Sequence, residues 1–255
     1  MEFQIRKEGK FKYIEEGRGE QTIICLHGLF GALSNFTDIV NDFKENYTVV
    51  VPLLPIFELP VREVTLEGLL EHVNEFITFR GYKNIHVIGN SLGGHISLLY
   101  VLGKVHPALS LTITGSSGLF ESAMGSTFPK RGDYDFITQK VKDTFYDPAM
   151  ATKETVDEVY DIVNDRNKAI RIIATAKSAI RHNLEHKMDG IDVPTLIIWG
   201  AEDNVTPPFV ATKFDELIKD SELHFIQECG HAPMMEKPKI FNEHVSTFYK
   251  SRFNN

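Results

Sequence analysis

The chain has 255 residues, a formal net charge of −8, and 42% hydrophobic and 24% charged residues. These values are typical of a globular protein with a real core, and the negative charge argues against a nucleic-acid partner, which needs a basic surface. The N-terminus has no apolar leader, and no stretch approaches the roughly 18 apolar residues of a membrane span. We therefore expect a cytoplasmic protein with no membrane partner.

Short apolar runs bounded by glycine, proline, aspartate or asparagine predict eight β-strands. They cover residues 3–6, 11–15, 22–26, 47–51, 85–88, 111–114, 195–199 and 223–226. The first two runs alternate in polarity on either side of Gly9, as an edge hairpin does, whereas the other six are nearly continuous apolar runs suited to a central parallel sheet. The predicted sheet is therefore mixed and mainly parallel.

Helical periodicity separates most of these strands, for example at residues 69–77, 95–102 and 240–248. Because strands and helices alternate along the chain, the sequence predicts the α/β class, with helices flanking the sheet. The sheet and its helices form a core of residues 1–118 and 188–255.

The alternation is interrupted between the sixth and seventh strands. Three helical patterns, at residues 136–146, 156–163 and 169–180, follow one another there without a convincing strand. We expect an inserted helical cap at residues 119–187, which would lie over the edge where strand C-termini open. Ligands of open α/β sheets bind at that edge.

A glycine-rich motif, Gly89-Asn90-Ser91-Leu92-Gly93-Gly94, joins the fifth strand to a helical run. A serine in a tight strand-to-helix turn needs small residues two places before and after it, and the turn exposes its hydroxyl above the sheet. Ser91 is therefore a candidate nucleophile. A serine with glycines at these two positions occurs by chance in very roughly one chain in ten of this length. The motif therefore supports this interpretation only together with the strand before it and the helix after it.

Two further loops bring titratable residues to the same edge. The seventh strand ends in Gly200-Ala201-Glu202-Asp203, and the eighth is followed by Cys229-Gly230-His231. His231 is the candidate general base, and Glu202 and Asp203 are both acids that could orient it.

The chain order Ser91, acid, His231, together with His27-Gly28-Leu29-Phe30-Gly31 after the third strand, resembles the α/β-hydrolase fold superfamily over essentially the whole chain. The resemblance implies Asp203 as the triad acid, because it aligns with the pattern Gly-x-x-Asp. It also implies that the backbone N–H groups of Leu29 and Leu92 form an oxyanion hole, the latter at the positive end of a helix.

Within this superfamily, the cap and Gly-Asn-Ser-x-Gly-Gly resemble the carboxylesterases and the meta-cleavage-product C–C bond hydrolases. The chain departs from the second group because Ala232, not tryptophan, follows the histidine. The resemblance implies a serine hydrolase that cleaves a carboxylic ester of a small or medium-sized molecule through an acyl-enzyme. A C–C bond hydrolase and a non-catalytic ligand-binding protein on the same scaffold remain alternatives.

Other residues leave further questions open. No metal-ligand spacing or nucleotide-binding glycine motif occurs, so we expect no metal and no cofactor. Six aromatic residues of the insertion fit either an apolar acyl pocket or packing within the cap: Phe120, Phe128, Tyr134, Phe136, Phe145 and Tyr146. Its arginines at 131, 166, 171 and 181 fit solvated helix charges better than a clamp for an acidic substrate. The sequence does not indicate the substrate-binding residues or the oligomeric state.

Overall fold

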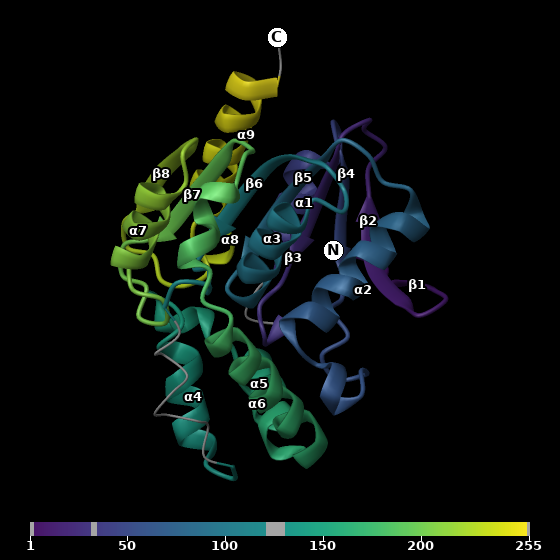
Figure 1. Ribbon diagram of the computed structural model, residues 1–255. Helices are drawn as coiled ribbons and strands as arrows, with labels where there is room; N and C mark the ends of the chain where they lie inside the picture. The colour runs from purple at the N-terminus through teal and green to yellow at the C-terminus, as the bar shows by residue number, and fades with distance from the viewer. Residues whose placement is uncertain (1–2, 32–34, 121–130, 254–255) are drawn as a thin grey trace.

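The computed structural model describes residues 3–31, 35–120 and 131–253, which form an eight-stranded sheet with strand order β1-β2-β4-β3-β5-β6-β7-β8 (Figure 1). The strands are β1 (Arg6–Glu8), β2 (Phe11–Glu16), β3 (Thr22–Leu26), β4 (Thr48–Pro52), β5 (Ile85–Asn90), β6 (Ala108–Thr114), β7 (Thr195–Gly200) and β8 (Ser221–Ile226). Strands β3 to β8 are parallel to one another, whereas β1 and β2 form an antiparallel hairpin at one edge, with β2 antiparallel to β4. The predicted α/β class and mainly parallel sheet are confirmed.

The first strand lies closer to the turn than the sequence predicts. Gly9 adopts a positive φ of 57°, which lets two residues close the hairpin, and Glu8 pairs with Phe11. Because the turn fixes the register, the strand forms at Arg6–Glu8 and not at residues 3–6.

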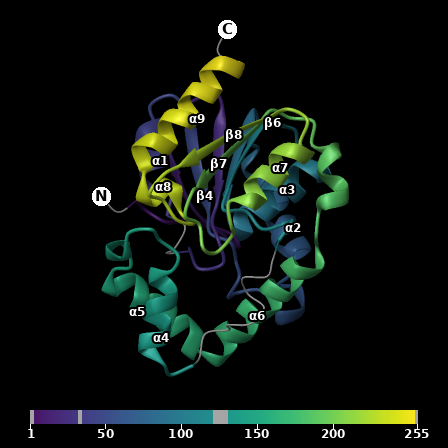
Figure 2. The ribbon, with the colours of Figure 1, turned by 90° about the vertical axis from the view of Figure 1, so that its left-hand side faces the viewer.

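Helices cover both faces of the sheet (Figure 2). One face carries α2 (Leu66–Arg80), α3 (Leu92–Gly103) and α7 (Phe209–Leu217), and the other carries α1 (Thr37–Phe43), α8 (Pro233–Glu236) and α9 (Pro238–Phe253). Two hydrophobic clusters, one on each face, enclose β3, β5 and β7, whose residues are all buried. Removal of this apolar surface from water is the main force that holds the layers together.

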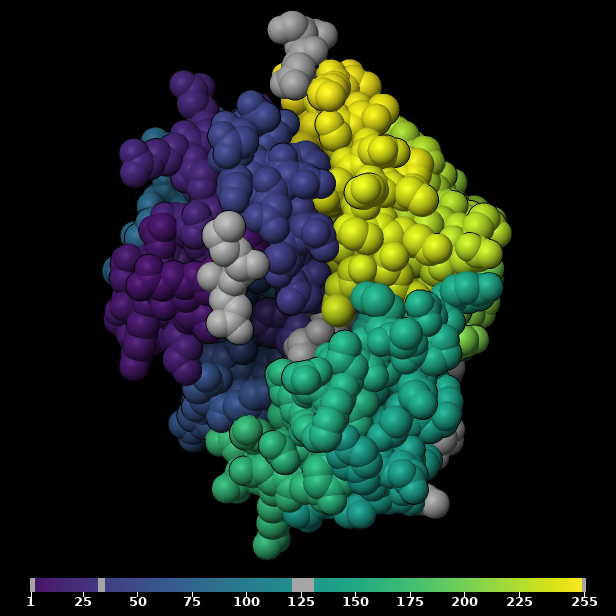
Figure 3. Space-filling model, turned by 180° about the vertical axis from the view of Figure 1, so that it is seen from behind, coloured from purple at the N-terminus to yellow at the C-terminus, as the bar shows by residue number. Residues whose placement is uncertain are grey.

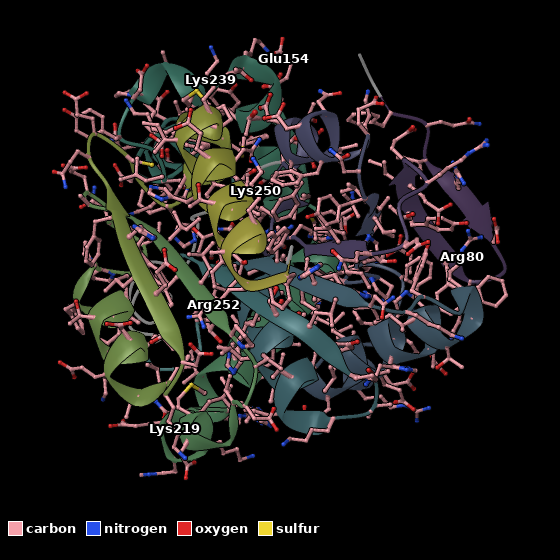
Figure 4. All side chains as sticks on the ribbon, turned by 90° about the horizontal axis from the view of Figure 1, so that it is seen from above. Arg80, Glu154, Lys219, Lys239, Lys250 and Arg252 are labelled. Atoms are coloured by element: carbon pink, nitrogen blue, oxygen red, sulfur yellow. The ribbon has the colours of Figure 1, made fainter. Side chains whose placement is uncertain are left out.

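Arg80, at the end of α2, attaches this helix to the edge hairpin of the sheet (Figure 4). Its guanidinium donates to both carboxylate oxygens of Glu8 and of Glu15, at 2.9–3.1 Å. A guanidinium that bridges two carboxylates in this way gives more stability than an isolated surface ion pair.

The described secondary structure between β6 and β7 consists of helices. It contains α4 (Tyr134–Lys142), η4 (Pro148–Met150), α5 (Lys153–Asn164), α6 (Arg166–Arg181) and η5 (Glu185–Gly190). The cap helices α4, α5 and α6 lie below the sheet in Figure 1 and form the lower part of the molecule in Figure 3. The exact cap boundaries, 119 and 187, stay a prediction.

Hydrogen bonds fasten α6 to the core. The Leu66 N–H donates to Ser178 Oγ at 3.0 Å, and Arg171 Nε donates to the Leu59 carbonyl at 3.0 Å.

Within the described chain, no helix is both long and apolar enough to span a bilayer.

Candidate active site

Ser91 lies in the turn between β5 and α3, with φ 55° and ψ −118°. A non-glycine residue with a positive φ is strained, and tertiary contacts must hold its backbone in that conformation. The Ser91 N–H donates to the Thr114 carbonyl of β6 at 3.1 Å, and its carbonyl accepts from the His95 N–H of α3 at 3.2 Å. The chain leaves β3 toward β4 and leaves β5 toward β6, so the serine stands at the point where strand order reverses, where α/β sheets bind ligands.

The glycines around Ser91 are required by contact with backbone. A Cβ atom on Gly93 would overlap the carbonyl oxygen of Leu26, the last residue of β3, and one on Gly89 would overlap the Gly93 carbonyl. The turn is therefore packed directly against the loop that begins at His27. This close packing brings the candidate oxyanion loop beside the serine.

Asp203 and His231 form a buried pair. The His231 Nδ1 atom lies 2.9 Å from Asp203 Oδ2, and the two residues are 5% and 3% exposed. Asp203 Oδ1 accepts two further hydrogen bonds, from the N–H groups of Val205 at 2.8 Å and Thr206 at 2.9 Å. These donors hold the carboxylate, so it can accept Nδ1–H and leave Nε2 of the imidazole available to act as a base. Glu202, the competing acid, instead accepts the Cys229 N–H at 3.0 Å.

Two residues that the sequence analysis did not select support His231. The Asn90 side-chain amide donates to the carbonyls of Thr114 and His231, each at 3.0 Å, and so joins the serine strand to the histidine loop. Gly115 has a φ of 54°, and a Cβ there would lie 2.8 Å from the His231 ring. Asn90 is inside the serine motif, but the sequence carries no local signal that pairs it with a residue 141 positions later.

A cavity of about 200 Å³ joins these residues to the cap. Ser91, His231, Leu29 and Leu92 line it on the core side. The cap contributes mainly aliphatic side chains, namely Ile137, Val141, Val159, Ala176, Ala179 and Ile180. Lys140 is the one cationic residue in the described lining. The structure thus gathers all five predicted site residues at one apolar cavity or directly behind it.

His27 braces the loop that carries Leu29. Its Nδ1 lies 2.8 Å from the Gly28 carbonyl, and its Nε2 accepts the Leu54 N–H at 2.9 Å. The two contacts require a neutral ring with the proton on Nδ1, and burial lowers the pKa of His27 accordingly.

No cluster of three or more potential metal ligands occurs among the described residues.

A family model described as "alpha/beta hydrolase fold" matches residues 21–238. The chain belongs to the α/β-hydrolase fold family. This confirms the resemblance that the sequence motifs indicated.

Individual α/β-hydrolases similar to this chain have names that indicate different substrates. An α/β-hydrolase enzyme, MGS-MChE2, from a sediment metagenome of the Mar Chica lagoon in Morocco is 40% identical, with a TM-score of 0.80 over 98% of this chain and 99% of that one. A 2-hydroxy-6-oxo-6-(2'-aminophenyl)hexa-2,4-dienoic acid hydrolase of Metapseudomonas resinovorans is 26% identical over 94% of this chain and 88% of its own length. Lipase 1 of Psychrobacter immobilis is also 26% identical, over 89% of this chain and 76% of its own length.

The structure divides the aromatic residues and arginines of this segment among the positions that the sequence left open. Of the aromatic residues, Phe120 lines the cavity, whereas Phe145 is buried and Tyr146 is exposed, and Phe128 lies outside the described residues. No arginine is in the described lining: Arg131 donates to the Asn164 carbonyl and Arg171 to that of Leu59. The described lining is therefore mainly apolar and contains no arginine clamp.

Proposed function

We propose that this chain is a serine hydrolase that cleaves carboxylic esters of neutral, short to medium-length acyl groups. The observation that carries the proposal is the buried Asp203–His231 pair, whose histidine lines the same apolar cavity as a serine in a strained strand-to-helix turn. Such a constellation is recognised by its geometry and by the roles of its members.

In the proposed reaction, Ser91 Oγ attacks the ester carbonyl while His231 Nε2 takes its proton. Asp203 holds the imidazole in the required tautomer and stabilises its charged form. The N–H groups of Leu29 and Leu92 stabilise the tetrahedral oxyanion. The protonated imidazole then gives its proton to the departing alcohol, and His231 activates a water molecule that releases the acid from the acyl-enzyme.

The cavity supports the choice of acyl group. Its cap wall is mainly aliphatic and its described lining contains no arginine, so a charged acyl chain would lack a bidentate partner. A cavity of about 150 Å³ holds benzene, so one of about 200 Å³ takes an acyl chain of about eight carbons. The lipase relative is consistent with an ester substrate.

The test combines labelling with turnover. A fluorophosphonate probe should modify Ser91, located by mass spectrometry, and the protein should hydrolyse p-nitrophenyl acetate and octanoate over many turnovers. Ser91→Ala should lose labelling and reduce kcat by at least about 10³-fold. Full esterase activity of Ser91→Ala would refute the mechanism, and labelling without turnover would favour a ligand-binding protein.

C–C bond hydrolysis is the second candidate, and Lys140 is the observation that favours it. Lys140 is among the residues that line the cavity, and its ammonium, if turned inward, would pair with the carboxylate of a dienoate such as the one named for the Metapseudomonas relative. Lys140 also lies 3.5 Å from Asp143, so its charge is already partly paired. Turnover of such a dienoate without ester hydrolysis, lost in Lys140→Met, would replace the ester proposal.

A further inference from the structure

The backbone that carries His231 is held from the cap side. The cap corner, residues 144–147, joins α4 to η4 and passes beneath α8 (Figure 2). The His231 N–H donates to the Thr144 carbonyl of this corner at 2.8 Å. A Cβ on the preceding Gly230 would lie 2.7 Å from Thr144 O and 2.8 Å from Tyr146 N. The corner and the histidine loop are therefore in direct backbone contact.

Glu236, the last residue of α8, bonds to both segments. Its Oε1 accepts the Gly230 N–H at 2.8 Å, and its Oε2 accepts the N–H groups of Tyr146 at 2.7 Å and Asp147 at 3.4 Å. Its three partners are donors only, so the site suits an ionised carboxylate and no neutral amide. One side chain thus connects the histidine loop with a cap corner about 90 residues away in sequence.

From these contacts we infer that Glu236 is a positioning residue that fixes His231 relative to Ser91 by clamping the histidine loop onto the cap corner. The inference rests on the proposed function, because it assigns His231 the role of base. A shift of about 1 Å in a reacting group costs about 10²-fold in rate. The clamp acts on the backbone of the residue directly before His231, so its loss moves the base.

The electrostatic surroundings of Glu236 disfavour its ionised form and so oppose this contact. Burial raises the pKa of the Glu236 carboxyl, the nearby charge of Asp203 raises it further, and the backbone N–H groups of Tyr146 and Gly230 act in the opposite direction. A half-buried carboxylate beside another carboxylate is unfavourable unless its hydrogen bonds are made.

Glu236→Gln tests the inference, because an amide nitrogen would face one of the backbone N–H donors. We expect kcat for p-nitrophenyl acetate to fall about 10- to 100-fold with little change in KM, since acetate is too short to depend on the cap wall. Amide hydrogen exchange in residues 228–233 and 144–147, which needs no substrate, should become faster. Glu236→Asp, which keeps the charge but cannot span both segments, should show intermediate exchange and provides a second variant if the first does not fold.

Glu228→Gln is the matched control, because Glu228 is on the same loop but is exposed and makes only a 3.8 Å contact with Lys237. We expect it to keep wild-type kcat and exchange. Unchanged exchange in Glu236→Gln, or a rise in KM for long esters alone with kcat intact, would overturn the positioning role. A wild-type protein that neither labels at Ser91 nor turns over esters would overturn the proposed function instead, and the two failures are thereby distinguished.

Discussion

At the scale of single residues, the serine turn depends on backbone packing more than on side-chain contacts. Ser91 has a positive φ, and the carbonyl of Leu26 occupies the space that a side chain at position 93 would need. The two loops that carry Ser91 and Leu29 are therefore fixed against one another by the absence of a Cβ. One methyl group at this contact should disturb both.

Gly93→Ala tests this dependence. We expect the rate of fluorophosphonate labelling and kcat/KM to fall about 100-fold, because the backbone oxygen of Leu26 cannot yield and the turn must shift. Overpacking should also destabilise the fold by about 1–3 kcal/mol, measured by urea unfolding. Gly103→Ala at the other end of α3 is the control, since a Cβ there meets nothing within 4 Å. It should be neutral or stabilising by up to about 1 kcal/mol. A Gly93→Ala protein that labels at the wild-type rate would show that the turn tolerates the shift.

At the scale of elements, hydrophobic periodicity located the helices better than it located their ends. The pattern predicts a helix at residues 136–146, whereas α4 runs over Tyr134–Lys142. Asp133 caps its start by accepting the Phe136 N–H, a local signal. After α4 ends, the N–H groups of the cap corner bond to Glu236. No local sequence signal predicts a partner so far along the chain. For the same reason, motifs placed Ser91, Asp203 and His231 at one edge, but not the supports from Asn90, Gly115 and Glu236.

The cap helices also lead to a prediction about the length of the acyl group that the cavity accepts. Ala176 of α6 lines the cavity, so Ala176→Phe should shorten the space for an acyl chain. We expect kcat/KM for p-nitrophenyl octanoate to fall about 10- to 100-fold while that for acetate changes little. Ile170→Phe is the control, because Ile170 is on the same helix but is 41% exposed and outside the described lining. Equal losses for both esters would mean that the acyl chain does not lie along α6.

At the scale of the whole molecule, several histidines are buried in their neutral form. Burial lowers the pKa of His86 and of His95 to about 4 from 6.5. His86 contacts Ser110 Oγ at 2.7 Å and stacks on Tyr249, and His95 contacts Ser117 Oγ at 3.1 Å. Both rings connect parts of the core, so their protonation is coupled to global unfolding.

Acidification should therefore destabilise the protein between pH 6.5 and about 4. In this range the unfolded chain binds protons at these histidines and the folded chain does not, so stability is fully present above pH 6.5 and is lost as pH falls. For His86 alone the loss at pH 5 is about 2 kcal/mol, from the shift in pKa. Urea unfolding at pH 7 and pH 5 should show that His86→Gln, although less stable at pH 7, loses about 2 kcal/mol less on acidification than the wild type. His186→Gln, at an exposed position, should follow the wild type. If His86→Gln lost as much stability as the wild type, other groups would dominate the acid response.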